Sequence, residues 1–324
     1  MDKPISDPKW TPVWIDLSMA TEWLELFECV FGTEMSSKLL KWKYRDTDTI
    51  GIGLRKENKL VAFYGGMPRD IIFEQQLVHA VQMGDVMVHP SERGAFTSKG
   101  AFWSVASNYI GTMVGEGKPY EIAFGFPNKR AYKLGHLLKL YEMVDSLTEL
   151  SWPVRKRFPL STWSFHDWKD TDIDHVSRLW GQMVKSLPES ALGVRDAQWL
   201  KTRYVNHPDL PYRIIIIHRA WKSRPEGILI FKDRGEDGLE LIDMIGDTAK
   251  IPMFIEMACR YGYQRSSPKV FCWITNSHLS YFESTHPVLH DIDIVIPFNV
   301  LTQGIKTKQI KNRWWLMAGD TDFR

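Results

Sequence analysis

Hydrophobic residues recur three or four positions apart in two segments of the first half of the chain, and this spacing predicts helices at 21–31 and 101–114. Expected cap residues predict two more helices, one at 37–44 after Ser36 and one from Asn128 to about residue 138. We expect each helix to pack one apolar face against a core.

Shorter apolar runs between these helices predict strands. The runs at 50–55 and 60–66 are separated by a turn and indicate a hairpin. The runs at 85–89 and 120–126 flank the helix expected at 101–114, so we expect them to be parallel neighbours in one sheet. The predicted fold class is therefore α/β, with mixed (α+β) sheets.

The second half of the chain repeats the first in outline, at offsets of roughly 150–160 residues. A polar, basic segment, Trp152–Pro159, separates the halves. We predict two tandem domains, 1–150 and 151–324; the alternative is two unrelated α/β halves. The matched segments are LKWKY at 40–44 with LKTRY at 200–204, DVM at 85–87 with DMI at 243–245, and IAFGFPN at 122–128 with VFCWITN at 270–276.

The overall composition is that of an ordinary globular protein, with 44% hydrophobic and 25% charged residues among 324. No apolar run approaches the ~20 residues that span a bilayer, and the start MDKPISDPKW has no apolar signal core. A net charge of +2 does not favour nucleic acid as the main partner, and three cysteines show no metal spacing. We expect a cytoplasmic protein without a metal, DNA or a membrane as partner, and its oligomeric state stays open.

The segment with the clearest candidate chemistry is VMVHPSERGAFTSKGAFWSVA, 86–106. After the strand come two basic-glycine pairs, Arg93-Gly94 and Lys99-Gly100, and then a helix. Unpaired N–H groups at a helix start attract anions, and glycines let a phosphate approach the backbone closely. The segment predicts a pyrophosphate site; the alternative is an ordinary strand-to-helix turn.

With Ala95–Ser98 left out, this loop resembles that of the GNAT acyltransferase superfamily. Those proteins have an Arg/Gln-x-x-Gly-x-Gly/Ala loop between their fourth strand and third helix, which holds the pyrophosphate of acyl-coenzyme A. The sequence VMVHP resembles that fourth strand, and FGFPNKRA, 124–131, resembles the fifth strand and the Asn-x-x-Ala start of the fourth helix. No Arg-Gly pair follows Asp243, so the second half resembles a degenerate copy.

The resemblance implies an acyl-coenzyme A-dependent N-acyltransferase, acting in a ternary complex. Acetyl-coenzyme A, or another acyl-coenzyme A, would be the co-substrate, and the acceptor would be the amine of a small molecule, sugar or peptide. The second half would shape the acceptor site. The residues implied to bind the co-substrate are Met87 and Val88 at the thioester, Arg93, Gly94, Lys99, Gly100 and Ala101 at the pyrophosphate, and Asn128 at the pantetheine arm.

The tetrapeptide Ala95–Ser98 lengthens the predicted phosphate loop. It either bulges outward and leaves both basic-glycine pairs in place, or displaces Arg93 and leaves Lys99-Gly100-Ala101 as the anion site. A third outcome is loss of coenzyme A binding.

The catalytic groups are less clearly marked. Asp85 lies where the family often places a carboxylate and is the candidate base; His89, Tyr64 and the segment 319–324 are alternatives. Many members of the family have a tyrosine that acts as the acid for the leaving thiolate, where this chain has Gly135. The nearest tyrosine, Tyr132, is the candidate acid here.

Two other functions stay open. The first is a non-catalytic acyl-coenzyme A-binding or sensor protein, which the interrupted loop and the missing tyrosine favour. The second is an aminoacyl-tRNA-dependent transferase of duplicated GNAT fold, which would not need a coenzyme A loop.

Overall fold

The computed structural model describes residues 9–45, 47–94, 100–154, 161–209, 211–222, 224–321 and 323. The chain forms two compact units. The predicted boundary is a single one at 150/151, whereas the main division between the units lies at 144/145 and each unit also includes shorter segments from elsewhere in the chain. Unit 1 comprises Met1–Ile71, Val78–Val144 and Ile294–Lys311, and unit 2 comprises Ile72–Leu77, Asp145–Asp293 and Asn312–Arg324.

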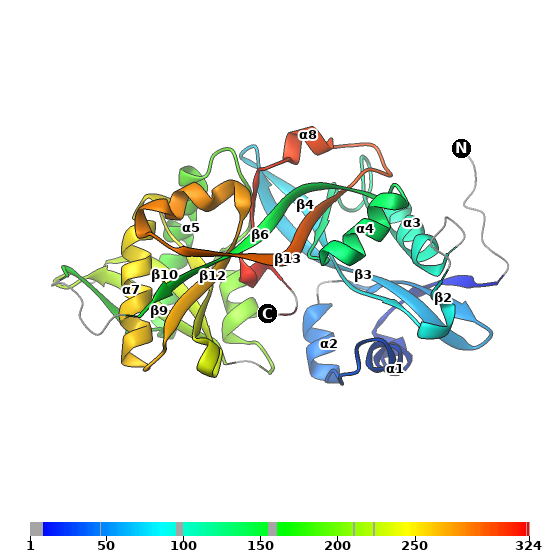
Figure 1. Cartoon of the computed structure of the whole chain (residues 1–324), viewed down its shortest axis with the longest axis horizontal. Coiled ribbons are helices and arrows are strands. Elements are labelled where there is room, and N and C mark those ends of the chain that lie inside the picture. Colours follow the sequence, from blue (N-terminus) through cyan, green and yellow to red (C-terminus); the bar gives the residue numbers. More distant parts are fainter. Residues whose placement is uncertain are drawn as a thin grey trace. The chain divides into compact units, whose positions relative to one another are not determined.

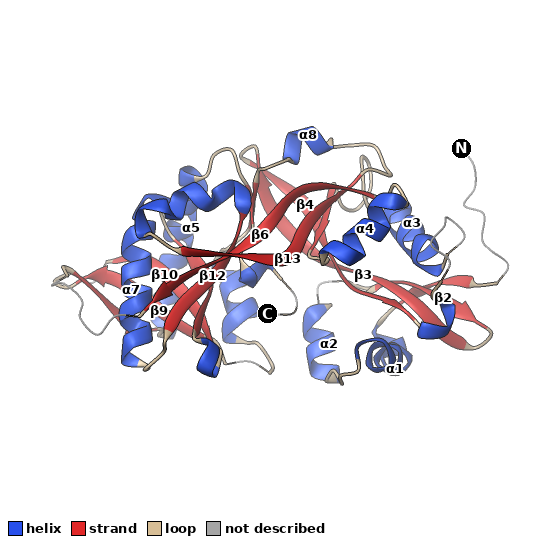
Figure 2. Cartoon of the chain, viewed as in Figure 1, coloured by secondary structure: helices blue, strands red, loops and turns tan. Residues whose placement is uncertain are grey.

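Unit 1 is built on a mixed sheet whose main path is β1-β2-β3-β4-β5 (Figures 1 and 2). The β1–β2 and β2–β3 pairs are antiparallel. The β4–β5 pair is parallel, as predicted, but its paired residues in β4 are 80–83 and not the predicted 85–89. The strands are β1 (Thr11–Ile15), β2 (Gly51–Lys56), β3 (Lys59–Phe73), β4 (Gln76–Val88) and β5 (Ile122–Gly125).

Helices cover both faces of this sheet (Figure 1). Apolar residues of α1 and α2 pack with Phe63 and Met87 in one core cluster, and those of α3 pack with Val81 and Ala123 in another. All four predicted helices are present within one or two residues of their predicted bounds. They are α1 (Ala20–Phe31), α2 (Ser37–Lys43), α3 (Ala101–Met113) and α4 (Lys129–Leu137); a short α8 (Thr307–Ile310) also belongs to unit 1.

Unit 2 contains a second mixed sheet, in the order β13-β6-β12-β11-β10-β9-β7. Its core is formed by inward side chains of these strands with α5 and α7. Strands β6 (Tyr141–Pro153) and β13 (Val288–Asn299) contribute residues to both units. The remaining elements are β7 (Trp163–Asp167), α5 (Val176–Ser186), β8 (Ala191–Gly193), α6 (Ala197–Leu200), β9 (Arg213–Arg219), β10 (Pro225–Asp233), β11 (Leu239–Ile245), α7 (Ile251–Gln264), β12 (Lys269–Thr275) and β14 (Trp314–Trp315).

The same buried contact occurs in both units and supports the predicted repeat. In unit 1 the Tyr44 hydroxyl donates to Asp85 at 2.9 Å, and in unit 2 the Tyr204 hydroxyl donates to Asp243 at 2.7 Å. These are the residues that the sequence comparison paired. Each aspartate lies on the strand that has a parallel neighbour, β4 in unit 1 and β11 in unit 2. The two units are therefore tandem copies of one fold.

Candidate functional site

The candidate site lies where β4 separates from β5 in unit 1. The parallel register runs from Ala80–Ile122 to Met83–Gly125, whereas β4 itself continues to Val88. Val81 and Met83 contact the α3 core, and so do Val86 and Val88 after an interval of three rather than two residues. One extra residue in a strand bends it and turns the following side chains to the other face. We therefore place a bulge at Gly84–Asp85.

Asp85, the predicted base, sits at this bulge in a left-handed conformation, with φ of +50°. Its carboxylate oxygens each lie 2.7 Å from Lys43 Nζ, and one also accepts from the Tyr44 hydroxyl. The exposed fractions of the Lys43 and Asp85 side chains are 3% and 7%. Gly65 of β3 makes room for this contact, because a Cβ there would lie 2.4 Å from the Tyr44 hydroxyl oxygen. A carboxylate in such a buried ion pair gains a proton only by losing the pair.

The loop after β4 is fixed at its first turn by Glu92. The buried carboxylate accepts from Trp10 Nε1 at 3.1 Å and lies 2.7 and 2.8 Å from the amino groups of Lys9 and Lys56. Hydrogen bonds from Lys56 and Lys9 lower the pKa of Glu92 to about 2. This turn positions Arg93, whose Nε donates to the Val88 carbonyl at 2.9 Å.

The two glycines of the described loop fit an anion site. Gly94 has φ of +121°, a conformation that other residues rarely adopt, and a Cβ there would meet no atom within 4 Å. Gly100 is the N-cap of α3 and provides no side-chain oxygen to its first N–H groups. The 13-residue helix thus presents its positive end to the loop. Lys99 and the tetrapeptide 95–98 lie outside the described residues.

Asn128 is the N-cap of α4, as predicted, and its Oδ1 accepts from the Ala131 N–H at 2.8 Å. Its predicted contact with pantetheine stays a prediction. Tyr132, the candidate acid, is half-buried on α4 and stacks on His136 with ring centroids 5.6 Å apart.

Gly135 stands where many family members have a tyrosine, and the ring of Tyr141 packs against it. A Cβ on Gly135 would lie 2.2 Å from the Tyr141 ring, so a larger residue does not fit there. The Tyr141 hydroxyl is hydrogen-bonded to the Tyr64 hydroxyl on β3, and burial raises the pKa of both phenols. This pair has no signal in the sequence, because nothing local links residues 64 and 141.

In unit 2 the corresponding strands, β11 and β12, also separate, and another segment of the same unit occupies the space between them. The β11–β12 register is limited to Leu239–Val270 and Glu240–Phe271. Beyond it, the Thr275 N–H of β12 donates to the Leu316 carbonyl at 3.2 Å, and a Cβ on Gly319 would lie 3.1 Å from Cβ of Asp243 on β11. The segment 314–321 therefore contacts both strands. Unit 2 also lacks the glycine loop, as the sequence indicated.

Buried charges hold this segment in unit 2. Arg195 donates to Asp243 at 2.9 Å and to Asp320 at 2.5 Å, and all three side chains are at most 1% exposed. Arg203 donates to the carbonyls of Gly319 and Thr321. The described residues contain no group of three or more acidic, histidine or cysteine side chains arranged for a metal ion, and no helix long and apolar enough to cross a membrane.

The fold is a tandem pair of α/β units in which a mixed sheet opens between two parallel strands. Residues 15–135 match the family model described as "Acetyltransferase (GNAT) domain". No curated protein matches the sequence.

Solved structures of low sequence identity have the same fold. One is a GCN5-related N-acetyltransferase from Anabaena variabilis, with 15% identity, a TM-score of 0.66 and coverage of 90% of this chain and 73% of that one. A probable N-acyltransferase from Enterococcus faecalis has 12% identity, a TM-score of 0.65 and coverage of 90% and 72%. Saccharomyces cerevisiae N-myristoyltransferase with bound myristoyl-CoA has 12% identity, a TM-score of 0.60 and coverage of 97% and 90%.

Proposed function

We propose that the protein is an acyl-coenzyme A-dependent N-acyltransferase that binds its acyl donor in unit 1. The observation that supports this most is the separation of β4 from β5 after Met83–Gly125, just before a loop that leads to the uncapped start of α3. Backbone N–H groups in a separated strand and a helix N-terminus are the donors that a thioester carbonyl and a pyrophosphate require.

In this proposal Arg93, Gly94, Gly100 and Ala101 bind the pyrophosphate, together with Lys99. The backbone amides of Met87 and Val88 polarise the thioester carbonyl. Asn128 contacts the pantetheine arm through its side-chain NH₂ group, which is not part of the cap bond to Ala131.

The reaction is a direct attack in a ternary complex. The free amine nitrogen attacks the thioester carbon, the C–S bond breaks, and coenzyme A leaves as a thiolate while the amine loses a proton. A thiol of pKa ~8.5 leaves without much help from an acid, so Tyr132 would contribute little. Asp85 would act as base only if substrate binding loosens its ion pair with Lys43.

Acetyl-coenzyme A is the donor that we expect, since the family model that residues 15–135 match describes an acetyltransferase domain. The yeast N-myristoyltransferase neighbour was solved with myristoyl-CoA, so a long-chain donor is the alternative. The acceptor is a small-molecule, sugar or peptide amine, and unit 2 would contribute to its recognition.

A second function, binding of acyl-coenzyme A without turnover, is favoured by two observations. The candidate base is held in a buried ion pair, and the place of the family acid is filled by Tyr141. A protein of this kind would respond to the ligand but release no thiol.

Thiol release from acetyl-CoA and from myristoyl-CoA over a panel of amines tests the proposal. We expect amine-dependent release with one donor, reduced at least about tenfold by Gly100→Glu, because a carboxylate at the α3 start repels the pyrophosphate. Gly111→Glu is the matched control on the same helix, where a side chain meets no atom within 4 Å, and it should release thiol at the wild-type rate.

Binding without release in every donor–amine pair would favour the sensor function. Neither binding nor release at millimolar donor would contradict both functions. Salt-sensitive binding of tRNA in that case would point to the aminoacyl-tRNA-dependent alternative.

A further inference from the structure

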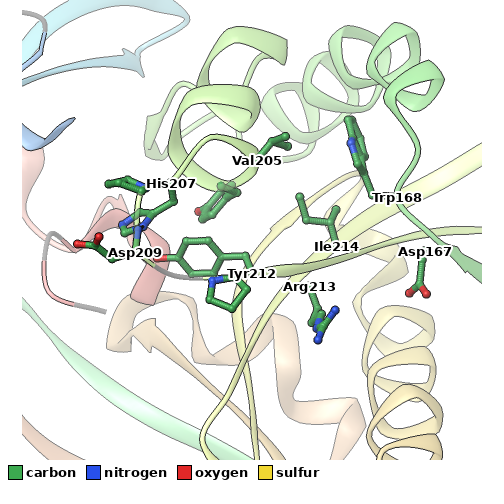
Figure 3. Close-up of a pocket in the computed structure, with 11 residues that line it drawn as sticks. Asp167, Trp168, Val205, His207, Asp209, Tyr212, Arg213 and Ile214 are labelled. Atoms are coloured by element: carbon green, nitrogen blue, oxygen red, sulfur yellow. The ribbon is translucent and has the colours of Figure 1, made fainter. Parts of the chain in front are cut away.

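Unit 2 has a pocket whose lining residues all belong to that unit. It has a volume of about 560 Å³, within the range of small-molecule pockets. It is lined by the end of β7, the helical turn at Lys201–Val205, the following loop, and the start of β9. Figure 3 shows His207, Asp209 and Tyr212 on one side of this pocket and Trp168 with Asp167 on the other.

The backbone beside the pocket departs from the repeated fold. Lys201–Val205 is a π-helical turn, whereas the matched segment of unit 1 ends an ordinary α-helix at Lys43. π-Helical turns are rare and occur often at functional sites. Here the turn places Tyr204 in the floor of the pocket, with the buried Arg203 behind it.

The aromatic floor is fixed before any ligand arrives. The rings of Tyr204 and Tyr212 meet edge to face at 5.1 Å, and His207 meets Tyr212 in the same way at 5.5 Å. The Tyr204 hydroxyl donates to Asp243 at 2.7 Å, and the buried Arg203 donates to the Tyr212 hydroxyl at 2.9 Å. A floor held in this way loses little conformational entropy on binding.

The walls add flat surfaces and negative charge. Trp168 has a buried indole N–H for which the described residues offer no acceptor, and Pro208 and Pro211 stiffen the loop. The ionic side chains that line the pocket are Asp167, Asp209 and Arg213, a formal charge of −1. The charges behind the floor, Arg195 and Arg203 with Asp243 and Asp320, sum to zero.

We propose that this pocket binds an organic cation with a flat apolar body, such as an arylalkyl ammonium ion. Trp168 and one ring of the aromatic floor would contact the flat body, and Asp209 at the rim would attract the ammonium group. Neither a phosphate nor a carboxylate ligand matches this charge. The site does not involve the acyl donor, so it goes beyond the proposed function.

Three ligands with the same indole body but different charge test the proposal by calorimetric titration of the full chain. They are tryptamine, which is cationic, 3-ethylindole, which is neutral, and indole-3-propionate, which is anionic. We expect tryptamine to bind about tenfold or more tightly than the other two, and its affinity to fall with rising salt.

Two variants locate the site. Asp209→Asn should reduce tryptamine affinity severalfold and leave 3-ethylindole unchanged, and Trp168→Ala should weaken both ligands. Asp237→Asn, the same substitution at an exposed turn of unit 2 outside the pocket, should change neither.

Equal or tighter binding of the neutral or anionic ligand would overturn the assignment of a cation. Tryptamine binding that ignores both pocket variants, or no binding at 10 mM, would overturn the site itself; that ceiling is about a hundredfold above the ~0.1 mM expected of a small ligand of this size. Because the titration contains no acyl-coenzyme A, its failure would leave the proposed acyltransferase function untouched.

Discussion

Asp85 forms a buried ion pair that stabilises the fold, whereas a role as base requires it to accept a proton. The equivalent Tyr–Asp contact exists in unit 2, which has no glycine loop, so the contact belongs to the common scaffold. We predict that Asp85→Asn lowers the free energy of unfolding by about 3 kcal/mol, since it leaves Lys43 buried without its counter-charge. Denaturant unfolding measures this.

The double variant Lys43→Met/Asp85→Asn should lose less stability than the sum of the two single variants. An Asp85→Asn variant as stable as wild type would contradict the scaffold role. If that variant also lost all turnover, the predicted role as base would gain support instead.

Glu92 makes loop stability depend on pH. Its pKa in the folded chain is about 2, below the ~4.3 of an unfolded glutamate, because Lys56 and Lys9 bond the charged form. Its contribution to stability is complete above that unfolded value and disappears as the pH falls towards 2.

We therefore predict that Glu92→Gln is less stable than wild type at pH 7, and that the difference shrinks progressively below about pH 4. Urea unfolding over this pH range measures the difference. Glu121→Gln, at an exposed position, is the control and should match wild type throughout. A constant gap between Glu92→Gln and wild type down to pH 2 would rule out the charge as its cause.

At the scale of elements, β4 consists of two parts with different partners. Residues 80–83 pair with β5, whereas residues after the bulge do not continue that register. We predict that the amides of Val86–Val88 exchange hydrogen faster than those of 80–83, and that acetyl-CoA slows the first group only. Hydrogen exchange followed by mass spectrometry tests this. Equal protection of both groups, unchanged by acetyl-CoA, would contradict the site.

Helices α1 and α3 could be predicted from their apolar faces, α2 and α4 from their caps Ser36 and Asn128, and the parallel strand pair also followed from local signals. The bulge at Gly84–Asp85 could not be predicted from the sequence. It is recognised only from the structure, which shows that Val86 faces the core of α3 and Met87 the core of α1 and α2. The Tyr64–Tyr141 contact and the burial of Asp320 depend on residues far apart in sequence. The pocket beside the π-helical turn had no sequence signal that we recognised.

At the scale of the whole molecule, duplication gave two sheets that open between parallel strands, but the opening in unit 2 contains the segment 314–321. That segment is held by Arg195 and Arg203 and includes five successive side chains that are at most 1% exposed, Trp314 to Ala318. Its removal from the split would expose this apolar surface and break buried ion pairs. The chain is therefore expected to bind a single acyl donor.

Calorimetric titration of the intact chain with acetyl-CoA tests this expectation and the proposed site together. The account predicts saturable binding at one molecule per chain, weakened by Gly100→Glu and unaffected by Gly111→Glu. Two molecules per chain would contradict the closed state of unit 2. No binding of acetyl-CoA or myristoyl-CoA at millimolar concentration would contradict the donor site itself.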